Sequence, residues 1–400
     1  MSKVPAPIPE NELKRLLSLS ELDLDFSNIE DSFKDLTTLA SKVTGTSVSL
    51  VNLIDSYTQW TVANHGLDLS QMPREESVCQ YTIMSQQPFE VLDMSADERF
   101  QRKFYVEGPL GLRYYYGLPL QLAEGLNIGA LCVLDTEVKT LTPEKVELLE
   151  IIAQTVVKRL KSIHALEILN AKLHESNTSK RKAAHDIRGP LAGIIGLSEL
   201  ISEQGDTADV KEFMEYISMI NKSGRSLLEL ADEILSEGTQ QQISEHEFNL
   251  PLLKDKLIEL YQPQAKSKKI NFNVLLESNN QTVPFLKNKL LQIAGNLISN
   301  AIKFTPEGGN IVVNLGLAVK EKDKVLRIVV TDSGVGIDPA VVEQIMSGNA
   351  SSTPGTMGEK GYGFGLSLVS HLVKSLQGSI AIQAAPGQGA RFEVLLPQAI

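Results

Sequence analysis

The spacing of apolar residues divides the first third of the chain into short helix-like and strand-like segments. Residues 29–43 have helical spacing, whereas residues 47–54 alternate as a half-buried strand. Residues 58–63 are expected to pair with that strand across a turn at Asp55-Ser56. Two further strands are predicted on either side of a hairpin turn at Glu124-Gly125, at residues 114–120 and 128–134. This region is therefore expected to mix helices and strands.

A long helical pattern follows the mixed region. Pro143 suits the first helical position, and Thr142 suits the cap before it. Apolar residues then recur in steps of three and four, which is the pattern of a coiled coil. They are Val146, Leu149, Ala153, Val156, Leu160 and Ile163. We expect a coiled-coil signalling helix over residues 143–180, which carries a rotation or a register change along the chain. A plain spacer is the alternative.

The next segment, residues 181–238, places a histidine beside an apolar seam. The seam consists of Ala184, Ile187, Leu191, Ile194, Ser198 and Ile201. His185 stands one residue off this seam and is therefore expected to face water, with Asp186 beside it. A neutral imidazole is a nucleophile, and a neighbouring carboxylate can orient it and accept its proton. Taken alone, a plain surface histidine is the simpler interpretation.

A second amphipathic helix completes a hairpin with the histidine segment. Residues 202–208 interrupt the pattern as a loop, and residues 210–234 then resume three-four spacing. One hairpin cannot cover its own apolar seam, whereas two hairpins can form a four-helix bundle. We therefore expect a homodimer.

The last domain, residues 246–400, alternates between helix-like and strand-like segments again. Helices are predicted at residues 285–304 and 365–376, and strands at residues 310–315, 325–332, 379–383 and 390–396. The first of these helices carries a polar stripe, because Gln292, Asn296, Asn300 and Lys303 follow one another in steps of four, four and three. Amide oxygens and a lysine on one face suit a hard cation and phosphates, with a solvated helix face as the simpler alternative.

Two glycine-rich stretches follow the polar stripe. In the first, Asp332-Ser-Gly334-Val-Gly336 comes directly after a predicted strand, where a carboxylate can accept a hydrogen bond from an amino group. In the second, Gly361-Tyr-Gly363-Phe-Gly365 leads into a helix, whose first backbone amides bind phosphate well. Residues 346–360 between them are small and suit a mobile lid. Each stretch alone is weak evidence, but the three in this order predict a nucleotide site.

Composition limits the classes of protein and the compartment. Four hundred residues imply two or three domains. A net charge of −11 argues against non-specific nucleic-acid binding and against a basic patch for membrane surfaces. Cys79 and Cys132 lack metal-ligand spacing and suit a reducing compartment. With no apolar run of transmembrane length and no signal-peptide core in the leader, residues 1–26, a cytoplasmic protein is expected.

Residues 27–142 resemble a GAF domain. Four stretches carry the resemblance, namely residues 77–83, 93–100, 111–120 and 129–135. The resemblance implies an antiparallel sheet with helices packed around it, often enclosing a pocket for a small molecule. Cys79 would suit a covalently attached chromophore, as in phytochromes, and His65 would suit a haem. A buried small apolar residue and an ordinary loop histidine are the simpler interpretations.

The three stretches of the last domain look like the N, G1 and G2 boxes of the histidine-kinase, chaperone and mismatch-repair (GHKL) ATPases. With His185-Asp186 on an upstream helix, the chain resembles a two-component sensor histidine kinase. The resemblance implies a multidomain α+β protein. Its parts would be the GAF-type antiparallel sheet, the helical hairpin that dimerises to a four-helix bundle, and an α/β-sandwich ATP-binding domain.

The resemblance also implies a role for each motif residue. Asn300 would hold Mg²⁺, Asn296 would assist near the phosphates, Lys303 would contact phosphate, and Asp332 would bind the adenine amino group of ATP. The pocket would be shaped by Gly334, Gly336, Gly361, Gly363 and Gly365. His185 would accept the γ-phosphoryl group, with Asp186 as its proton acceptor, and would pass it to an aspartate on the receiver domain of a separate response regulator.

Two alternatives and one departure accompany this interpretation. The alternatives are a nucleotide-binding signalling scaffold without phosphotransfer and a serine/threonine kinase of the anti-sigma type, which shares the ATP-binding fold but lacks the histidine hairpin. The departure is Gly189, four residues after the histidine, where the family commonly has threonine or asparagine. A residue without a side chain cannot orient a water there, which predicts weak phosphatase activity.

Overall fold

The structure is a computed structural model of the chain. It describes residues 7–26, 29–204, 214–215, 217–225, 227–228, 247–277, 279–287, 289–320, 323–338, 341–342, 355–356 and 363–398. By its contacts the chain divides into two compact units. The first unit joins Met1–His164 to Glu247–Ala399, and the second is Ala165–His246.

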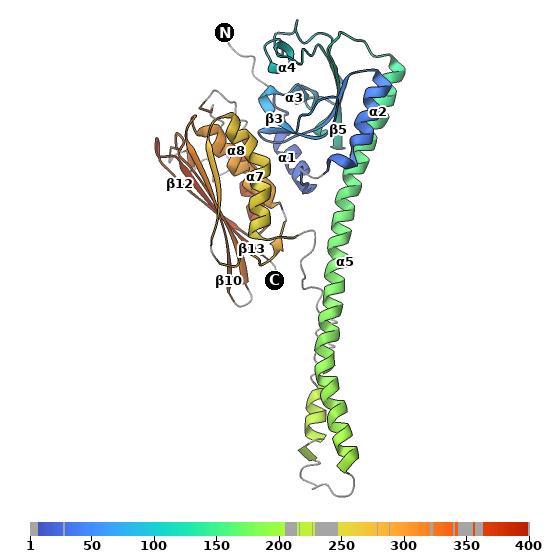
Figure 1. Ribbon diagram of the computed structural model, residues 1–400, viewed down its shortest axis with the longest axis vertical. Coiled ribbons are helices and arrows are strands. Elements are labelled where there is room, and N and C mark those ends of the chain that lie inside the picture. The colour runs from blue at the N-terminus through green and yellow to red at the C-terminus, as the bar shows by residue number, and fades with distance from the viewer. Residues whose placement is uncertain are drawn as a thin grey trace. The chain divides into compact units, whose positions relative to one another are not determined.

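The sensor part of the first unit is built on a six-stranded antiparallel sheet (Figure 1). The strands lie in the order β3-β2-β1-β6-β5-β4, which are Gln71–Pro73, Thr58–His65, Val48–Ile54, Leu126–Asp135, Tyr114–Ala123 and Phe89–Val91. The predicted strands and both predicted turns are confirmed, and Gly125 adopts a φ of +72° in the second turn. The helices around the sheet are α1 (Glu12–Glu21), α2 (Lys34–Thr44), α3 (Cys79–Thr82) and α4 (Phe104–Glu107), with 3₁₀ turns at Glu30–Ser32 and Arg74–Glu76. The helix predicted over 29–43 is thus a 3₁₀ turn followed by α2.

Helix α5 (Pro143–Gln204) begins as part of the sensor core. Its first turns bury Leu149, Ala153, Val156 and Leu160 with side chains of α1, α2 and one face of the sheet. These are the positions with coiled-coil spacing, so the sensor domain itself covers this part of the predicted seam. The helix also continues through residues 202–204, where a loop was predicted.

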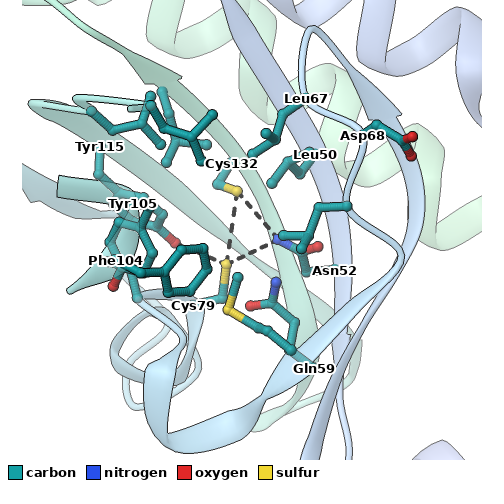
Figure 2. Close-up of a pocket in the computed structure, with 16 residues that line it drawn as sticks. Leu50, Asn52, Gln59, Leu67, Asp68, Cys79, Phe104, Tyr105, Tyr115 and Cys132 are labelled. Atoms are coloured by element: carbon teal, nitrogen blue, oxygen red, sulfur yellow. Dashed lines mark hydrogen bonds between the residues drawn. The ribbon is translucent and has the colours of Figure 1, made fainter. Parts of the chain in front are cut away.

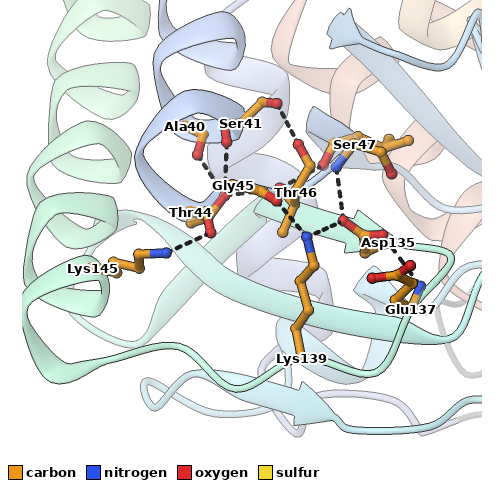
Figure 3. A network of polar contacts seen from close by, with 11 residues as sticks. Ala40, Ser41, Thr44, Gly45, Thr46, Ser47, Asp135, Glu137, Lys139 and Lys145 are labelled. Carbon is orange, nitrogen blue, oxygen red and sulfur yellow. Dashed lines mark hydrogen bonds and ion pairs between the residues drawn. The ribbon is translucent and has the colours of Figure 1, made fainter.

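A polar network fixes the start of α5 to the sensor (Figure 3). Lys145 of α5 donates to the backbone oxygen of Thr44 at 2.9 Å, at the C-terminal end of α2. Lys139 donates to the backbone oxygen of Gly45 and pairs with Asp135 at 2.7 Å. Ammonium groups stabilise the negative end of a helix dipole, so both lysines stabilise the junction of α2, β6 and α5.

The second half of the first unit is a two-layer sandwich. Its sheet runs β12-β13-β11-β10-β8, which are Ser379–Ala384, Ala390–Gln398, Asp323–Asp332, Asn310–Lys320 and Asn271–Leu276. Only β8 and β10 pair in parallel among these strands. The helices α7 (Leu250–Ser267), α8 (Leu290–Phe304) and α10 (Phe364–Ser375) share one apolar core with the sheet (Figure 1).

The helix predicted over residues 285–304 is too long by five residues at its start. Phe285 and Leu286 form β9, which pairs with β7 (Glu247–Phe248), and α8 begins only at Leu290. Lys289 has a φ of +60°, which interrupts a helix before that point. The strand pairing involves a segment far away in the sequence, and helical spacing alone could not reveal it.

The second unit contains the histidine segment of α5. The backbone at His185 and Asp186 is helical, and so are residues 214–215, 217–225 and 227–228, where the second helix of the hairpin was predicted. The loop residues 205–208 lie outside the described residues, as do residues 343–354 and 357–362, which contain most of the predicted lid. Within the described ranges, no helix combines the length and the apolar character needed to cross a membrane.

Candidate nucleotide-binding site and sensor cavity

Helix α8 places the polar stripe inside the protein rather than in solvent. Asn296, Asn300 and Lys303 have only 3%, 4% and 6% of their surfaces exposed. The opposite stripe of the helix is buried in the core of the sandwich. A helix with both faces covered needs partners for its polar side chains, because a buried amide without a hydrogen bond costs about 1–3 kcal/mol.

The amide of Asn296 has unused hydrogen-bonding capacity. Its nitrogen donates to the backbone oxygen of Gln292 at 2.9 Å. Its oxygen Oδ1 finds no hydrogen-bond partner within the described ranges. A buried acceptor of this kind fits a site that gains a donor or a hydrated cation when a ligand binds.

Asp332 lies at the end of β11 with its carboxylate held by the backbone. Its Oδ1 accepts hydrogen bonds from the amide nitrogens of Gly334, at 2.8 Å, and Ala390, at 3.2 Å. Burial raises the pKa of Asp332 above its ordinary value, while these two hydrogen bonds oppose the rise. The group is thus fixed in direction, as recognition of an amino group requires.

Glycine is required at two points around this carboxylate. Gly336 has a φ of +73°, and a Cβ atom there would lie 1.9 Å from the backbone oxygen of Ala385. A Cβ atom on Gly334 would lie 2.4 Å from the backbone oxygen of Phe304, at the end of α8. The loop after β11 therefore packs against α8 only without side chains, which brings the first glycine stretch to the polar stripe.

The second glycine stretch reaches the same stripe through α10. Gly363 has a φ of +80° and precedes the first residue of the helix, and Gly365 is buried within its first turn. A Cβ atom on Gly365 would lie 3.1 Å from Oδ1 of Asn296. Gly361 lies outside the described residues. The structure therefore brings together Asn296, Asn300, Lys303, Asp332 and four of the five predicted glycines, around the C-terminal half of α8.

Two residues near the end of α8 were missed by the sequence analysis. Lys268 donates to the backbone oxygens of Ile302 and Lys303 and to the hydroxyl of Thr356, each at 2.8 Å. Thr356 donates in turn to the backbone oxygen of Thr305 at 3.1 Å. Lys268 therefore ties the stretch between the two glycine motifs to the end of α8. No local motif marks a lysine at the end of the preceding helix for this role.

Tyr57 of the sensor domain was also missed. It lies in the turn between β1 and β2, close to the side chain of Asn300, whose nitrogen Nδ2 has no hydrogen-bond partner within the described ranges. Lys303 Nζ lies 5.9 Å from the centroid of its ring. A Cβ atom on Gly365 would lie 2.7 Å from a ring carbon of Tyr57 and 2.8 Å from its hydroxyl oxygen. Burial raises the pKa of Tyr57, so the hydroxyl stays protonated at neutral pH.

The sensor domain encloses a separate cavity of about 270 Å³ (Figure 2). Its wall is mostly apolar and includes Leu50, Leu67, Val78, Phe104, Leu112 and Leu134. Both cysteines lie on this wall with their sulfur atoms 3.7 Å apart. Asn52 donates to Cys79 Sγ at 3.2 Å and to Cys132 Sγ at 3.4 Å, and Tyr115 donates to Cys79 Sγ at 3.3 Å. Both cysteines are therefore buried, as the simpler interpretation of Cys79 predicted.

The two thiols have different acidities because their surroundings differ. Burial alone would raise the pKa of Cys79, but its hydrogen bonds with Cys132, Tyr115 and Asn52 outweigh burial and lower it. Burial raises the pKa of Cys132. His65 stands at the end of β2 rather than in a loop, 3.4 Å from the hydroxyl of Thr38, and is not part of the cavity wall. No group of three or more His, Cys, Asp or Glu side chains in the described part of the chain could hold a metal ion.

Three protein families match successive parts of the chain. Residues 28–160 match the GAF domain, residues 181–242 match the His Kinase A (phospho-acceptor) domain, and residues 286–400 match the histidine kinase-, DNA gyrase B- and HSP90-like ATPase. The order is that of a GAF-containing sensor histidine kinase. The match to the third family covers the polar stripe and both glycine stretches.

Curated relatives match longer but incomplete segments. A cyclic di-GMP phosphodiesterase of Pseudomonas aeruginosa is 38% identical over 165 residues, which are 41% of this chain and 28% of that protein. The cell-division control histidine kinase PdhS of Brucella suis is 29% identical over 58% of this chain and 24% of its own length. The sensor protein EvgS of Escherichia coli O157:H7 is 27% identical over 61% of this chain and 21% of its own length. The chain thus spans about a quarter of the length of these relatives.

Proposed function

This chain belongs to the sensor histidine kinases that carry a GAF domain, and we propose that it phosphorylates its own His185 with ATP. The observation that carries the proposal is the convergence of Asn296, Asn300, Lys303 and Asp332 with the two glycine stretches at α8. Each group has the chemistry that one part of ATP requires. Asp332 suits the adenine amino group, and Lys303 suits a phosphate.

Mg²⁺ fits the amide end of this site. The side-chain oxygen of Asn300 would hold it, and the unpartnered Oδ1 of Asn296 would accept a hydrogen bond from one of its waters. Mg²⁺ commonly binds through few protein ligands and keeps waters and phosphate oxygens for the rest of its shell, so three clustered carboxylates are not needed. When bound, it neutralises charge on the phosphates.

The proposed reaction is an in-line phosphoryl transfer. A nitrogen of the neutral His185 imidazole attacks the γ-phosphorus of ATP, and the bond from that phosphorus to the bridging oxygen breaks as the N–P bond forms. ADP leaves with the electron pair, and the imidazole proton passes to Asp186. The phosphoryl group then moves to an aspartate carboxylate on the receiver domain of a response regulator. The hairpin of residues 181–238 is the proposed homodimer interface and phosphotransfer domain.

Labelling with γ-phosphate-labelled ATP tests the assignment of the phosphoacceptor. We expect an acid-labile, base-stable label on the wild-type chain and none on His185→Gln. An acid-stable label would indicate a serine or threonine kinase, and nucleotide binding without any label would indicate a scaffold. Asn300→Ala serves as the matched variant in the other motif, because it should lose both label and Mg²⁺-dependent nucleotide binding.

The sensor cavity is the proposed ligand site of the GAF domain. Its size and apolar wall suit a small, largely apolar molecule, and the amide of Asn52 and the two thiols offer the polar contacts. Native mass spectrometry of the purified chain tests this proposal. We expect an additional mass that disappears on denaturation and that is reduced in a variant with a filled cavity, such as Val78→Phe.

A further inference from the structure

The turn between β1 and β2 places a sensor side chain in the nucleotide site. We propose that Tyr57 closes this site. ATP would then bind only after the sensor domain withdraws from the ATPase domain, the two-layer sandwich that begins at Glu247. The inference rests on the proposed function, since it takes Asn300 and Lys303 as ligands of the nucleotide. According to this inference, the sensor domain directly inhibits nucleotide binding, in addition to any signal that it sends along α5.

Tyr57 touches the groups that a nucleotide would need. Its hydroxyl lies close to Asn300, whose buried Nδ2 has no hydrogen-bond partner among the described residues, and its ring lies beside the ammonium group of Lys303. The same ring fills the space in front of Gly365, where a backbone without a side chain would otherwise admit phosphate. The ring of Tyr57 and the phosphates of ATP cannot occupy this space together. In this closed arrangement Asn296, Asn300 and Lys303 are almost completely buried.

A buried charge cluster holds the turn in this position. The carboxylate of Glu12, on α1, pairs with Arg15 at 2.8 Å and with Arg74 at 2.5 Å, and these side chains are between 0% and 1% exposed. Arg15 also donates to the backbone oxygen of Ile54 at 2.6 Å, and Arg74 to that of Asp55 at 3.1 Å. The guanidinium groups of Arg15 and Arg74 therefore fix the backbone shortly before Tyr57 by hydrogen bonds.

The backbone on the other side of the tyrosine is held as well. The amide nitrogen of Arg74 donates to the backbone oxygen of Tyr57 at 2.8 Å. The amide nitrogen of Asp55 donates to the backbone oxygen of Thr58 at 2.9 Å, which closes the turn. A tyrosine on a turn fixed from both sides loses little further freedom when it enters the pocket, so the entropic cost of closing is low.

Beyond Tyr57, the sensor domain also contacts α7 along a docking seam, which is distinct from the apolar seam of the hairpin. Phe26 stacks on Trp60 with ring centroids 5.3 Å apart, and Trp60 packs edge-on against Tyr261 of α7 at 6.0 Å. Gln264 of α7 donates to the side-chain oxygen of Gln71 at 2.6 Å, and Gln71 donates to the backbone oxygen of Leu260 at 3.0 Å. The closed state therefore depends on an apolar contact with specific polar bonds, and not on Tyr57 alone.

A second set of contacts joins the leader to α7 and to the start of α8. Asp23 accepts from the amide nitrogen of Lys289 at 2.9 Å, and Asp25 pairs with Lys256 at 3.1 Å. Leu16 of α1 belongs to the apolar core of the ATPase domain. The leader thus supports the same closed arrangement as the turn that carries Tyr57.

Competition between Tyr57 and the nucleotide has a reciprocal consequence. If sensor docking weakens nucleotide binding by a given factor, nucleotide binding weakens sensor docking by the same factor. Trp60 reports on docking directly, because it is the single tryptophan of the chain, is 4% exposed and lies on the seam. Undocking would transfer its indole from an apolar contact to water and shift its emission to longer wavelength.

The test measures the affinity of the full chain for a non-hydrolysable ATP analogue with Mg²⁺ by calorimetry. Tyr57→Ala removes the ring that fills the site. Binding of the analogue should therefore tighten by about 5- to 150-fold, the usual range of coupling between two sites. Tyr81→Ala is the matched control, because it also removes a sensor tyrosine, one that stacks on Phe89 away from the seam. Unchanged or weaker binding in Tyr57→Ala would overturn the proposal.

Trp60 emission provides a second measurement that needs no change at Tyr57. Saturating analogue and Mg²⁺ should shift the emission of the wild-type chain to longer wavelength, and should leave Asn300→Ala unchanged. An unshifted spectrum at saturation would show that nucleotide binds without undocking, which contradicts the proposal. Failure of the proposed function looks different, because then neither the wild-type chain nor Tyr57→Ala binds the analogue at all.

Discussion

Two buried polar clusters of the first unit, one at the sensor cavity and one at the nucleotide site, are closed in different ways. Around the sensor cavity, the cysteines and Asn52 are bonded to one another, and the wall comes from the sensor domain alone. Around the nucleotide site, the polar side chains of α8 are covered by Tyr57, which comes from another domain. A ligand can enter the cavity without displacing a neighbouring domain, whereas a nucleotide must compete with one. Four changes test this difference, and their expected effects on closure of the nucleotide site range from large to none.

The largest effect is expected from Glu12→Gln. This change leaves Arg15 and Arg74 buried without their shared carboxylate, which typically costs about 3–5 kcal/mol for a buried ion pair. The turn that carries Tyr57 should loosen, so nucleotide affinity should rise while the free energy of unfolding falls. Denaturant unfolding and calorimetry measure the two quantities. Glu21→Gln, an exposed glutamate at the end of the same helix, should leave both unchanged.

Low pH should open the nucleotide site, because it protonates the carboxylate of Glu12. Burial alone would raise the pKa of Glu12, but Arg15 and Arg74 outweigh burial and lower it from 4.5 to about 2. A carboxylate with a lowered pKa stabilises the folded state above its ordinary pKa, and that stabilisation is lost as the pH falls from 4.5 towards 2. Trp60 emission should therefore shift to longer wavelength over this range.

Other carboxylates also gain protons at low pH. The informative quantity is therefore the difference between the pH curves of the wild-type chain and of Glu12→Gln. Glu12→Gln lacks the titrating group and should lose the corresponding part of the acid dependence. If the emission of both chains followed the same pH curve, the charge cluster would not be what holds the turn.

A smaller effect is expected from Gln264→Ala, on the ATPase side of the seam. The change removes the 2.6 Å hydrogen bond to Gln71 and a longer one, of 3.3 Å, to the hydroxyl of Thr58, and each hydrogen bond contributes about 0.5–1.5 kcal/mol net. Nucleotide affinity should rise by a few-fold at most, and less than in Tyr57→Ala. Lys266→Ala, an exposed position on the same helix, is the control and should have no effect. An effect as large as that of Tyr57→Ala would place the main closing contact at α7 instead.

The smallest effect on the nucleotide site is expected from oxidation of the sensor cavity. Diamide should join Cys79 to Cys132, since their sulfur atoms lie 3.7 Å apart and one thiol is acidified. The two thiols lose two protons and two electrons, and diamide takes them up as the hydrazine. Mass spectrometry should find the cross-linked peptides in the wild-type chain and not in Cys132→Ser. Nucleotide affinity should not change, and a change would show that the two clusters are not independent.

Local patterns were sufficient for most of the nucleotide site. The four-four-three spacing placed Asn296, Asn300 and Lys303 on one face of α8, and the structure confirms that placement. The turn at Asp55-Ser56 was also predicted from the strands around it. Both features depend on residues close together in the chain, where helical and strand periodicity hold.

Contacts between distant segments could not be predicted in this way. Nothing about the residues near Tyr57 indicates that this side chain meets Asn300, because the meeting depends on how two domains dock. The same limit explains the error at Phe285, which pairs with Phe248 as a strand although its own spacing suits a helix. It also explains why the polar stripe could not be distinguished from a solvated face before its covering was known.

The lysine network at the start of α5 has a practical consequence for building chimaeric receptors. A fusion joint at Pro143 would match the end of the sensor suggested by the sequence pattern. It would cut Leu149, Val156 and Leu160 away from the apolar core they complete, and Lys145 away from the helix end it stabilises. A joint placed after His164 keeps that core whole. Exchanged sensors should therefore bring the first six turns of α5 with them, so that the splice falls in the part of the helix that leaves the domain.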